Sequence, residues 1–282
     1  MSREAFEAKL RAVEELRGVA APVPGLRRAL RDRNNYVVSK AASVSGALQL
    51  AELIPDLLTA FDRFFADPAK TDPQCWAKHA IAKALLELGH HEAEPYRRGL
   101  AHIQREPVWG GQVDTAATLR GACALALIDC RLDDVTLLTC LAEALADPES
   151  TVRVDAAVAL SRAGIPEAVA LLRHKALSGD PAPEVLGQCF HALLQMTPRD
   201  AVPFVERFLD RDEEVAAEAA SALAQCPEPA AWEAIERLWK RLLTPDFRTA
   251  LRAFLAASPH REAAKALFGE PPGSEPPATI PP

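Results

Sequence analysis

A sequence repeat with a spacing of 30 to 42 residues runs through most of the chain and restricts the folds that it can form. Its clearest copy covers residues 147–160: an acidic turn, a valine, a cation, two small residues and a leucine, and residues 210–223 repeat it closely. With the valine as the anchor of each copy, weaker copies bring the total to seven, with anchors at Val37, Ala77, Leu119, Val152, Val185, Val215 and Phe247. A period of this length predicts a row of stacked supersecondary units.

The composition indicates that each unit is built from helices. The 282 residues include 54 alanines and only 6% aromatic residues, and alanine favours helices whereas aromatic and β-branched residues favour strands. An amphipathic segment also precedes several anchors, at residues 54–65, 135–145, 168–177, 201–209 and 231–243. Two helices per repeat follow, joined at the turns Asp147-Pro148, Asp180-Pro181 and Pro245-Asp246, where proline suits a first helical turn. We therefore predict an all-α, right-handed α-solenoid of about seven helical hairpins.

The two ends differ from this pattern. Residues 1–16 alternate charged and apolar residues with helical periodicity, which predicts an amphipathic helix and not a signal peptide. We expect a capping helix over residues 1–23, the repeats over residues 24–268, and a disordered proline-rich tail over residues 269–282.

The pattern D-x-x-x-x-V-R-x-x-A-A-x-x-L at residues 147–160 resembles HEAT repeats, particularly the short bacterial HEAT-like type that includes the phycobilin-lyase repeats. In that family, the acid of the turn and the cation after the valine commonly bond across successive repeats. The cation position holds Lys78, Arg120, Arg153 and Arg248 here, but Val38, Leu186 and Ala216 in the other repeats. The resemblance therefore implies a ladder of ion pairs along only part of the chain, and the alternative for Lys78 and Arg248 is a solvated helix start.

The largest interruption of the repeat lies at residues 106–115, which contain Pro107, Trp109 and the pair Gly110-Gly111. We expect a loop that contacts a partner through Trp109 and Gln112. The alternative is that Trp109 fills the groove between repeats. Asp114 or Thr115 is expected to cap the helix that follows.

Charge is distributed unevenly along the chain. Residues 1–131 carry a net charge of +2 and residues 132–282 a net charge of −9. A basic patch at Arg27, Arg28, Arg31 and Arg33 could meet phosphate or an acidic protein surface, or could simply be a solvated helix face. Because the acidic second half would repel nucleic acid, we do not expect nucleic acid as a partner.

None of the familiar catalytic motifs is present. The six cysteines include no C-x-x-C pair and are expected to be buried thiols in a reducing cytoplasm, and no uncharged apolar stretch is long enough for a transmembrane helix. HEAT-like deoxyhypusine hydroxylases hold two irons with His-Glu dipeptides on several repeats, whereas this chain has the single dipeptide His91-Glu92. No G-x-S-x-G, P-loop or G-x-G-x-x-G occurs. We expect no catalytic residue, no metal and no cofactor.

Two families of HEAT-like enzymes offer analogies at the level of the fold. Phycobilin lyases have a similar length and repeat style and act on a tetrapyrrole. Alkylpurine DNA glycosylases use tryptophans and an aspartate in a basic groove, which Trp109 and Asp114 resemble only superficially.

From these observations we predict a non-catalytic HEAT-repeat scaffold that binds a protein partner on its concave surface. The residues predicted to bind that partner are Trp76, Trp109, Gln112, Arg120 and Arg153. The alternative is an enzyme or chaperone that acts on a bound ligand, as a phycobilin lyase does, and a DNA glycosylase or nucleic-acid binder is the weakest candidate. We expect a cytoplasmic protein without a membrane partner; its oligomeric state stays open, with a monomer as one option.

Overall fold

The computed structural model describes residues 3–241 and 243–268, and it confirms the all-helical fold. The described residues form seventeen α-helices, short 3₁₀ turns and a single two-stranded sheet. The chain divides into two compact units, unit 1 up to Ala163 and unit 2 from Gly164 onward, and each is described by itself. The proline-rich tail predicted at residues 269–282 lies outside the described residues.

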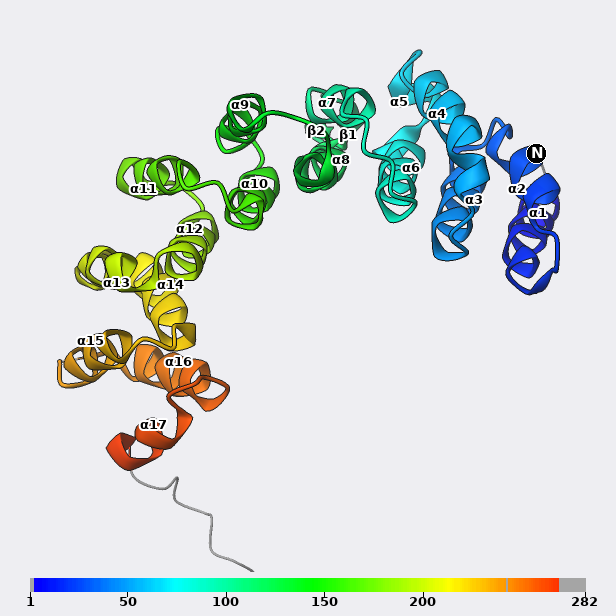
Figure 1. Ribbon diagram of the computed structural model, residues 1–282. Helices are drawn as coiled ribbons and strands as arrows, with labels where there is room; N and C mark the ends of the chain where they lie inside the picture. The colour runs from blue at the N-terminus through cyan, green and yellow to red at the C-terminus, as the bar shows by residue number, and fades with distance from the viewer. Residues whose placement is uncertain (1–2, 242, 269–282) are drawn as a thin grey trace, which may run out of the picture. The chain divides into compact units, whose positions relative to one another are not determined.

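Unit 1 begins with a capping helix and continues with four helix pairs. The pairs are α2 with α3, α4 with α6, α7 with α8 and α9 with α10, so that α4, α7 and α9 form one row and α3, α6, α8 and α10 form the other (Figure 1). We call these the first-helix row and the second-helix row. The elements are α1 Arg3–Glu15, α2 Val23–Leu30, α3 Asn35–Ala47, α4 Ile54–Arg63, α5 Pro68–Thr71, α6 Trp76–Glu87, α7 Glu94–Leu100, β1 Arg105–Val108, β2 Gly111–Asp114, α8 Ala117–Ala126, α9 Asp134–Ala144 and α10 Ser150–Ala163.

Unit 2 contains three further pairs and a final helix. In chain order the pairs are α11 with α12, α13 with α14 and α15 with α16, so the described chain has the predicted seven hairpins. The elements are α11 Ala168–Ser178, α12 Pro183–Met196, α13 Pro198–Glu206, α14 Glu213–Gln225, α15 Pro229–Trp239, α16 Pro245–Ala256 and α17 Arg261–Phe268. None of the described helices is long and apolar enough to cross a membrane.

The anchor residues of the repeat lie where the helices pack. Six of the seven are buried, Val215 being half-buried, and each lies in the first turns of a second helix. The alanine pairs Ala156-Ala157 and Ala219-Ala220 are fully buried, because a small side chain lets neighbouring helix backbones approach closely. One hairpin cannot cover its own apolar stripe. The helix pairs therefore stack, because stacking buries this stripe against the next pair.

The interruption at residues 106–115 is an antiparallel β-hairpin, which we did not predict. Strands β1 and β2 pair Arg105 with Asp114 and Val108 with Gly111, and Trp109 and Gly110 form the two-residue turn. Gly110 has a φ of +89°, a conformation that glycine adopts without strain. The N-cap residue of α8 is Ala116, which makes no side-chain capping bond, so the predicted capping by Asp114 or Thr115 is wrong; Asp114 instead accepts the backbone N–H of Ala116, one residue before the helix.

Candidate functional site

The second-helix row of unit 1 is hollowed by two neighbouring cavities, which we call the second-helix groove. The first cavity, of about 540 Å³, lies between α3 and α6, and the second, of about 310 Å³, lies along α6, α8 and α10. His79 and Lys83 line both cavities and so connect them. Volumes of this size are typical of sites for small molecules.

Aromatic rings form one end of the groove. Trp76 opens α6 and is 49% exposed, and its ring meets the edge of Tyr36 with centroids 5.1 Å apart. Phe6 from α1 lies 6.0 Å from Tyr36 on the other side. A partly exposed tryptophan held by a second ring offers a flat apolar surface to a ligand.

Two lysines and one acid, Glu87, line the same part of the groove, so the lysines outnumber the acid there. Lys40 lies over the Tyr36 ring with Nζ 5.6 Å from the centroid, and Lys83 points from α6 into both cavities. Neither lysine forms an ion pair with any described residue. Burial, and then the charge of Lys83, lower the pKa of His79, so this imidazole is neutral at physiological pH.

A half-buried carboxylate lines the far end of the groove. Asp155 extends from α10 over Gly121 of α8, so closely that a Cβ atom at Gly121 would collide with the carboxylate. Burial raises the pKa of Asp155, which forms no ion pair with any described residue. The groove therefore joins an aromatic end, lined by Lys40, Lys83 and Glu87, to a far end lined by Asp155.

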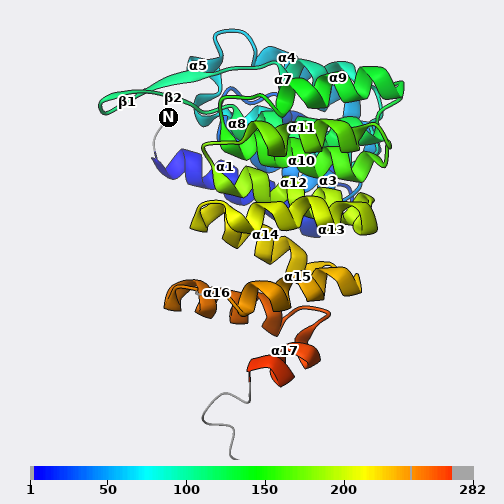
Figure 2. The same ribbon diagram turned by 90° about the vertical axis from the view of Figure 1, so that its left-hand side faces the viewer.

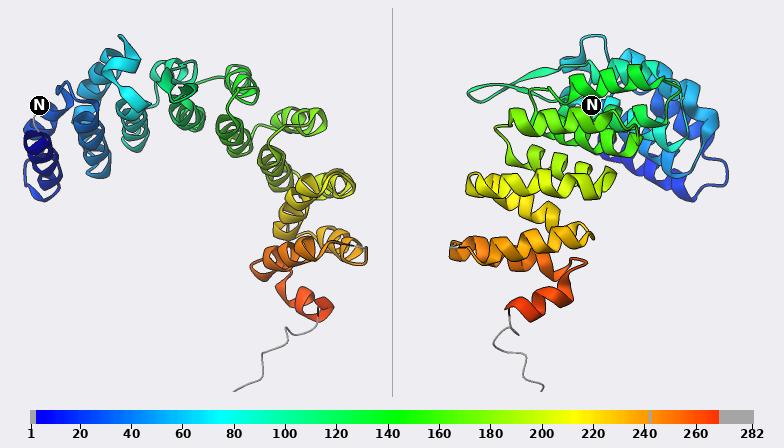
Figure 3. Two further views of the ribbon diagram at one scale, coloured as in Figure 1. Left: turned by 180° about the vertical axis from the view of Figure 1, so that it is seen from behind. Right: turned by 60° about the vertical axis from the view of Figure 1, so that its left-hand side comes forward.

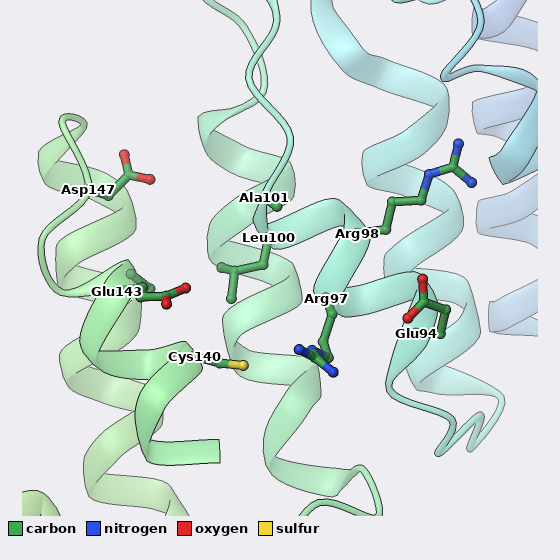
Figure 4. Close-up of a pocket in the computed structure, with 9 residues that line it drawn as sticks. Glu94, Arg97, Arg98, Leu100, Ala101, Cys140, Glu143 and Asp147 are labelled. Atoms are coloured by element: carbon green, nitrogen blue, oxygen red, sulfur yellow. The ribbon is translucent and has the colours of Figure 1, made fainter. Parts of the chain in front are cut away.

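A separate cleft of about 450 Å³ lies on the first-helix row, between α7 and α9 (Figure 4). Figure 4 shows Arg97 pointing into it, with Cys140 and Glu143 on the facing helix. Arg98 is engaged elsewhere, because it pairs with Asp62 at 2.7 Å and stacks on the Phe65 ring. Charges of both signs and no exposed ring line this cleft, so it defines a ligand less well than the groove does.

The turns of unit 1 hold a buried polar network at one end of the second-helix row. Lys78 is fully buried, and its ammonium donates to Asp72 at 3.0 Å, to Gln104 at 2.9 Å and to the carbonyl of Phe64 at 3.2 Å. Asp72 also accepts the backbone N–H groups of Ala77 and Lys78, at the start of α6. Lys78 is therefore a buried structural residue, and the alternative of a solvated helix start is wrong for it.

Arg120 forms the predicted ladder contact between repeats. Its guanidinium pairs with Asp114 of its own repeat at 2.6 Å and with Asp147 of the next repeat at 2.7 Å. Burial raises the pKa of Asp114, but hydrogen bonds from Ala116, Gln104 and Arg120 more than offset this and hold it below its usual value. Arg153 is also buried and donates to the carbonyls of Asp147 and Pro148.

The structure separates the residues that we predicted to bind a partner. Trp76 alone lines the groove, whereas Arg120 and Arg153 are buried in the polar network. Trp109 is fully exposed at the hairpin tip, so the alternative in which it fills a groove between repeats is wrong, and Gln112 is exposed on β2.

The basic patch is partly neutralised by an acid of the neighbouring helix. Asp56 of α4 pairs with Arg27 at 2.8 Å and with Arg31 at 3.4 Å, while Arg28 and Arg33 are exposed. Neither cavity of the second-helix groove has any of these arginines in its lining.

One sequence signal for the polar network was overlooked. An aspartate stands six positions before the cation position in six repeats, as Asp32, Asp72, Asp114, Asp147, Asp180 and Asp210. This spacing lets the carboxylate reach the first N–H groups of the second helix and the cation beside them. The residues of the groove carry no comparable signal, because Tyr36, Lys40, Lys83 and Asp155 occupy different positions of their repeats.

No three histidine, cysteine or acidic side chains of the described residues come together in a way that could hold a metal ion. His91 and Glu92 are both exposed, and Glu92 lies near Arg131. All six cysteines are free and five are buried, and burial raises the pKa of the Cys75 thiol to about 12. The five buried thiols are core side chains, as predicted, and Cys130 is half-buried.

No protein-family model matches the chain, and no curated protein sequence matches it. Among solved structures, the chain is similar to human deoxyhypusine hydroxylase in complex with glycerol, with 21% identity over 89% of each chain and a TM-score of 0.35. The all-helical architecture itself is shown by the seventeen helices of the described residues.

The expected function is corrected by this comparison. The matched structure is an enzyme, which contradicts the prediction of a non-catalytic scaffold for a protein partner and agrees better with the alternative, a HEAT-like protein that acts on a bound ligand. A similarity at this identity and TM-score transfers no activity to this chain.

Proposed function

We propose that unit 1 binds a planar, anionic small molecule in the second-helix groove and acts on this ligand. One observation carries the proposal: two lysines without ion pairs, Lys40 and Lys83, lie beside the edge-to-face rings of Tyr36 and Trp76 in one cavity. Flat apolar surface next to positive charge is complementary to a ring system that bears carboxylates.

The dimensions of the groove favour an elongated ligand. The two cavities, of about 540 and 310 Å³, share His79 and Lys83, so a molecule on Trp76 can extend towards Asp155. An open-chain tetrapyrrole, which has conjugated rings and two propionates, belongs to this class. It is the ligand class of the phycobilin-lyase alternative.

Each groove residue has a distinct role in this proposal. Trp76 and Tyr36 contact the face of the ring system, and Lys40 and Lys83 pair with the carboxylates. His79, neutral because burial lowers its pKa, presents a ring nitrogen in the part common to both cavities. Asp155, whose pKa is raised by burial, can exchange a proton with the far end of the ligand.

A titration with biliverdin tests the proposal. We expect a change in its visible absorption on binding, about tenfold weaker binding in Trp76→Ala, which corresponds to ~1.4 kcal/mol, and a similar loss in Lys83→Ala. Lys70→Ala, which removes an exposed lysine of α5, and Val135→Ala, which removes an exposed apolar group of α9, are matched controls and should bind as the parent does.

Two results would contradict the proposal. One is an absorption spectrum that the parent protein leaves unchanged; the other is equal affinity in the parent, Trp76→Ala and Lys83→Ala. Salt-dependent retention of single-stranded DNA by the parent, weakened in Trp76→Ala and Lys83→Ala, would instead favour the nucleic-acid alternative.

A further inference from the structure

The hairpin β1–β2 carries the largest group of exposed apolar side chains in the described part of the chain. Three of the eight large apolar residues exposed there lie on the hairpin, namely Val108 at 48%, Trp109 at 103% and Val113 at 44%, and Ile103 at 57% lies just before β1. Within the described residues, the Trp109 ring stacks on no other ring and no cation lies over it. The apolar side chains of the tip therefore do not contribute to packing within the described part of the protein, and an exposed apolar group of this kind indicates an interaction site.

The strand register gathers this apolar surface on one face. Val108 lies opposite Gly111 and Val113 opposite Glu106, so the two valines share a face and Trp109 extends it at the turn. Arg105, Gln112 and Asp114 belong to the other face, which lines a hollow of about 220 Å³ with Pro148 and Glu149. Residues 107–113 include no charged side chain.

The base of the hairpin is firmly held. The buried carboxylate of Glu106 accepts hydrogen bonds from the Gln104 amide at 2.6 Å, the Thr115 hydroxyl at 2.7 Å and the backbone N–H of Gln74 at 2.7 Å. The backbone of Thr115 bonds to Gln104 at 2.9 Å, which closes the hairpin where it leaves the helices. Figure 2 shows the strands projecting beyond the helices of unit 1, and the right view of Figure 3 shows the same.

We infer that this hairpin tip inserts Val108, Trp109 and Val113 into the interfacial region of a lipid bilayer. Tryptophan favours the boundary between headgroups and acyl chains, where its ring is apolar and its N–H stays hydrated. The seven residues of the tip are far fewer than the 20–30 residues that each side of a stable protein interface contributes. An uncharged tip also offers no ionic contact that would select a protein partner.

This inference is independent of the groove and departs from the expectation that the protein has no membrane partner. The contact is peripheral and shallow, since only a two-residue turn and its flanking valines take part. A single small insertion gives reversible binding, comparable to that of proteins with one weak anchor.

Vesicle binding by the full-length chain tests the inference. We expect the parent to sediment with phosphatidylcholine vesicles independently of salt, and brominated lipids to quench its tryptophan fluorescence. Trp109→Ala should lower the binding at least tenfold and remove the quenching, and the double variant Val108→Ser with Val113→Ser should also weaken binding. Val135→Ser removes a more exposed valine, on α9, and should sediment as the parent does.

Trp109 is fully exposed, so Trp109→Ala should keep the melting temperature of the parent. A loss of vesicle binding in this variant can then be distinguished from a loss of folding. No sedimentation of the parent, or equal sedimentation of Trp109→Ala, would overturn the inference. Binding that needs anionic lipid and disappears in high salt would also overturn it, and would point to the arginines of α2.

Discussion

Unit 1 and unit 2 are built from the same kind of helix pair but treat the cation position of the repeat differently. In unit 1, Lys78 and Arg120 are buried and tie the turns together, whereas in unit 2 the equivalent residues are Leu186, Ala216 and the half-buried Arg248. Two turn acids of unit 2 pair with cations at other positions, Asp180 with Lys175 at 2.7 Å and Asp210 with Arg241 at 2.6 Å. Stacking of helix pairs therefore does not require a buried cation.

The unit that contains the buried cations, unit 1, is also the unit with the irregular connections between helices. The four non-glycine residues of the described chain with positive φ, Gln49, Asp67, Gln74 and Cys75, all lie in unit 1, as does the hairpin. Gln74 and Cys75 are consecutive, and their turn brings the Asp72 carboxylate onto the start of α6. The buried ions of unit 1 hold turns whose own backbone conformations are unfavourable.

The largest expected effect separates the two units directly. Lys78→Met leaves the buried Asp72 carboxylate without its cation, and we expect a loss of about 3–5 kcal/mol in the stability of unit 1. Lys175→Met removes a partly exposed partner of Asp180 in unit 2 and should cost less. Urea unfolding followed by circular dichroism measures both, and equal costs would contradict the difference between the units.

A steric feature that both units share gives the second prediction. Gly121 faces Asp155 in unit 1, and Gly187 faces Glu218 in the same way in unit 2. Gly121→Ala should destabilise by about 1–3 kcal/mol, because the short aspartate cannot move far from the new methyl group. Gly187→Ala should cost less, since the longer glutamate side chain can swing away.

The pair Gly121→Ala with Asp155→Ala should recover most of the stability lost in Gly121→Ala. Thermal melts of the single and double variants form a cycle that isolates this contact. A double variant no more stable than Gly121→Ala would contradict the steric explanation.

The third prediction concerns the pH dependence of Asp155. Burial raises its pKa in the folded state, so the ionised group destabilises the fold above that pKa, and this cost disappears as the pH falls below the ordinary value. Asp155→Asn should exceed the parent in stability near pH 7, and this gain should shrink as the pH falls below the ordinary pKa of an aspartate. Denaturant unfolding at several pH values measures this.

Asp114 provides the opposite case in the same unit. Its pKa is lowered, so Asp114 stabilises the fold above its ordinary pKa, and this contribution is lost as the pH falls. Asp114→Asn should therefore be less stable than the parent at neutral pH. A gain in stability for Asp114→Asn at neutral pH would contradict the stabilising role of the Asp114 carboxylate and its contrast with Asp155.

The smallest expected effect is that of Trp109→Ala on stability. The side chain is fully exposed, so the melting temperature should change only slightly, corresponding to less than about 0.5 kcal/mol. Differential scanning calorimetry measures it. A larger loss would mean that the hairpin contributes to the stability of unit 1.

The sequence predicted the helix pairs well because their pattern is periodic and local. The anchors and alanine pairs recur at fixed positions of the repeat. Because most of these positions are buried, each repeat packs its two helices in the same way. The hairpin was missed because Glu106 and Thr115, whose contacts hold its base, are partnered by Gln74 and Gln104, and such distant pairings leave no periodic trace.

The candidate site was only partly predictable for the same reason. Trp76 stood out as an aromatic residue at a helix start, but its neighbours Tyr36 and Lys83 come from different positions of their repeats and meet only when α3 and α6 pack. Arg120 and Arg153 occupy the cation position of the repeat and were predicted to bind a partner. Their hydrogen bonds to the turn at Asp147 show that this position has a structural role.

The closed base of the hairpin also has a consequence for how such a chain can change in evolution or engineering. Residues 104 and 115 are joined by a backbone hydrogen bond of 2.9 Å, so everything between them enters and leaves the helix stack at a single point. A loop of another length or sequence could be grafted between these two residues while α7 and α8 keep their places, provided that a carboxylate replaces Glu106. This connection is thus a replaceable module between two helices of unit 1.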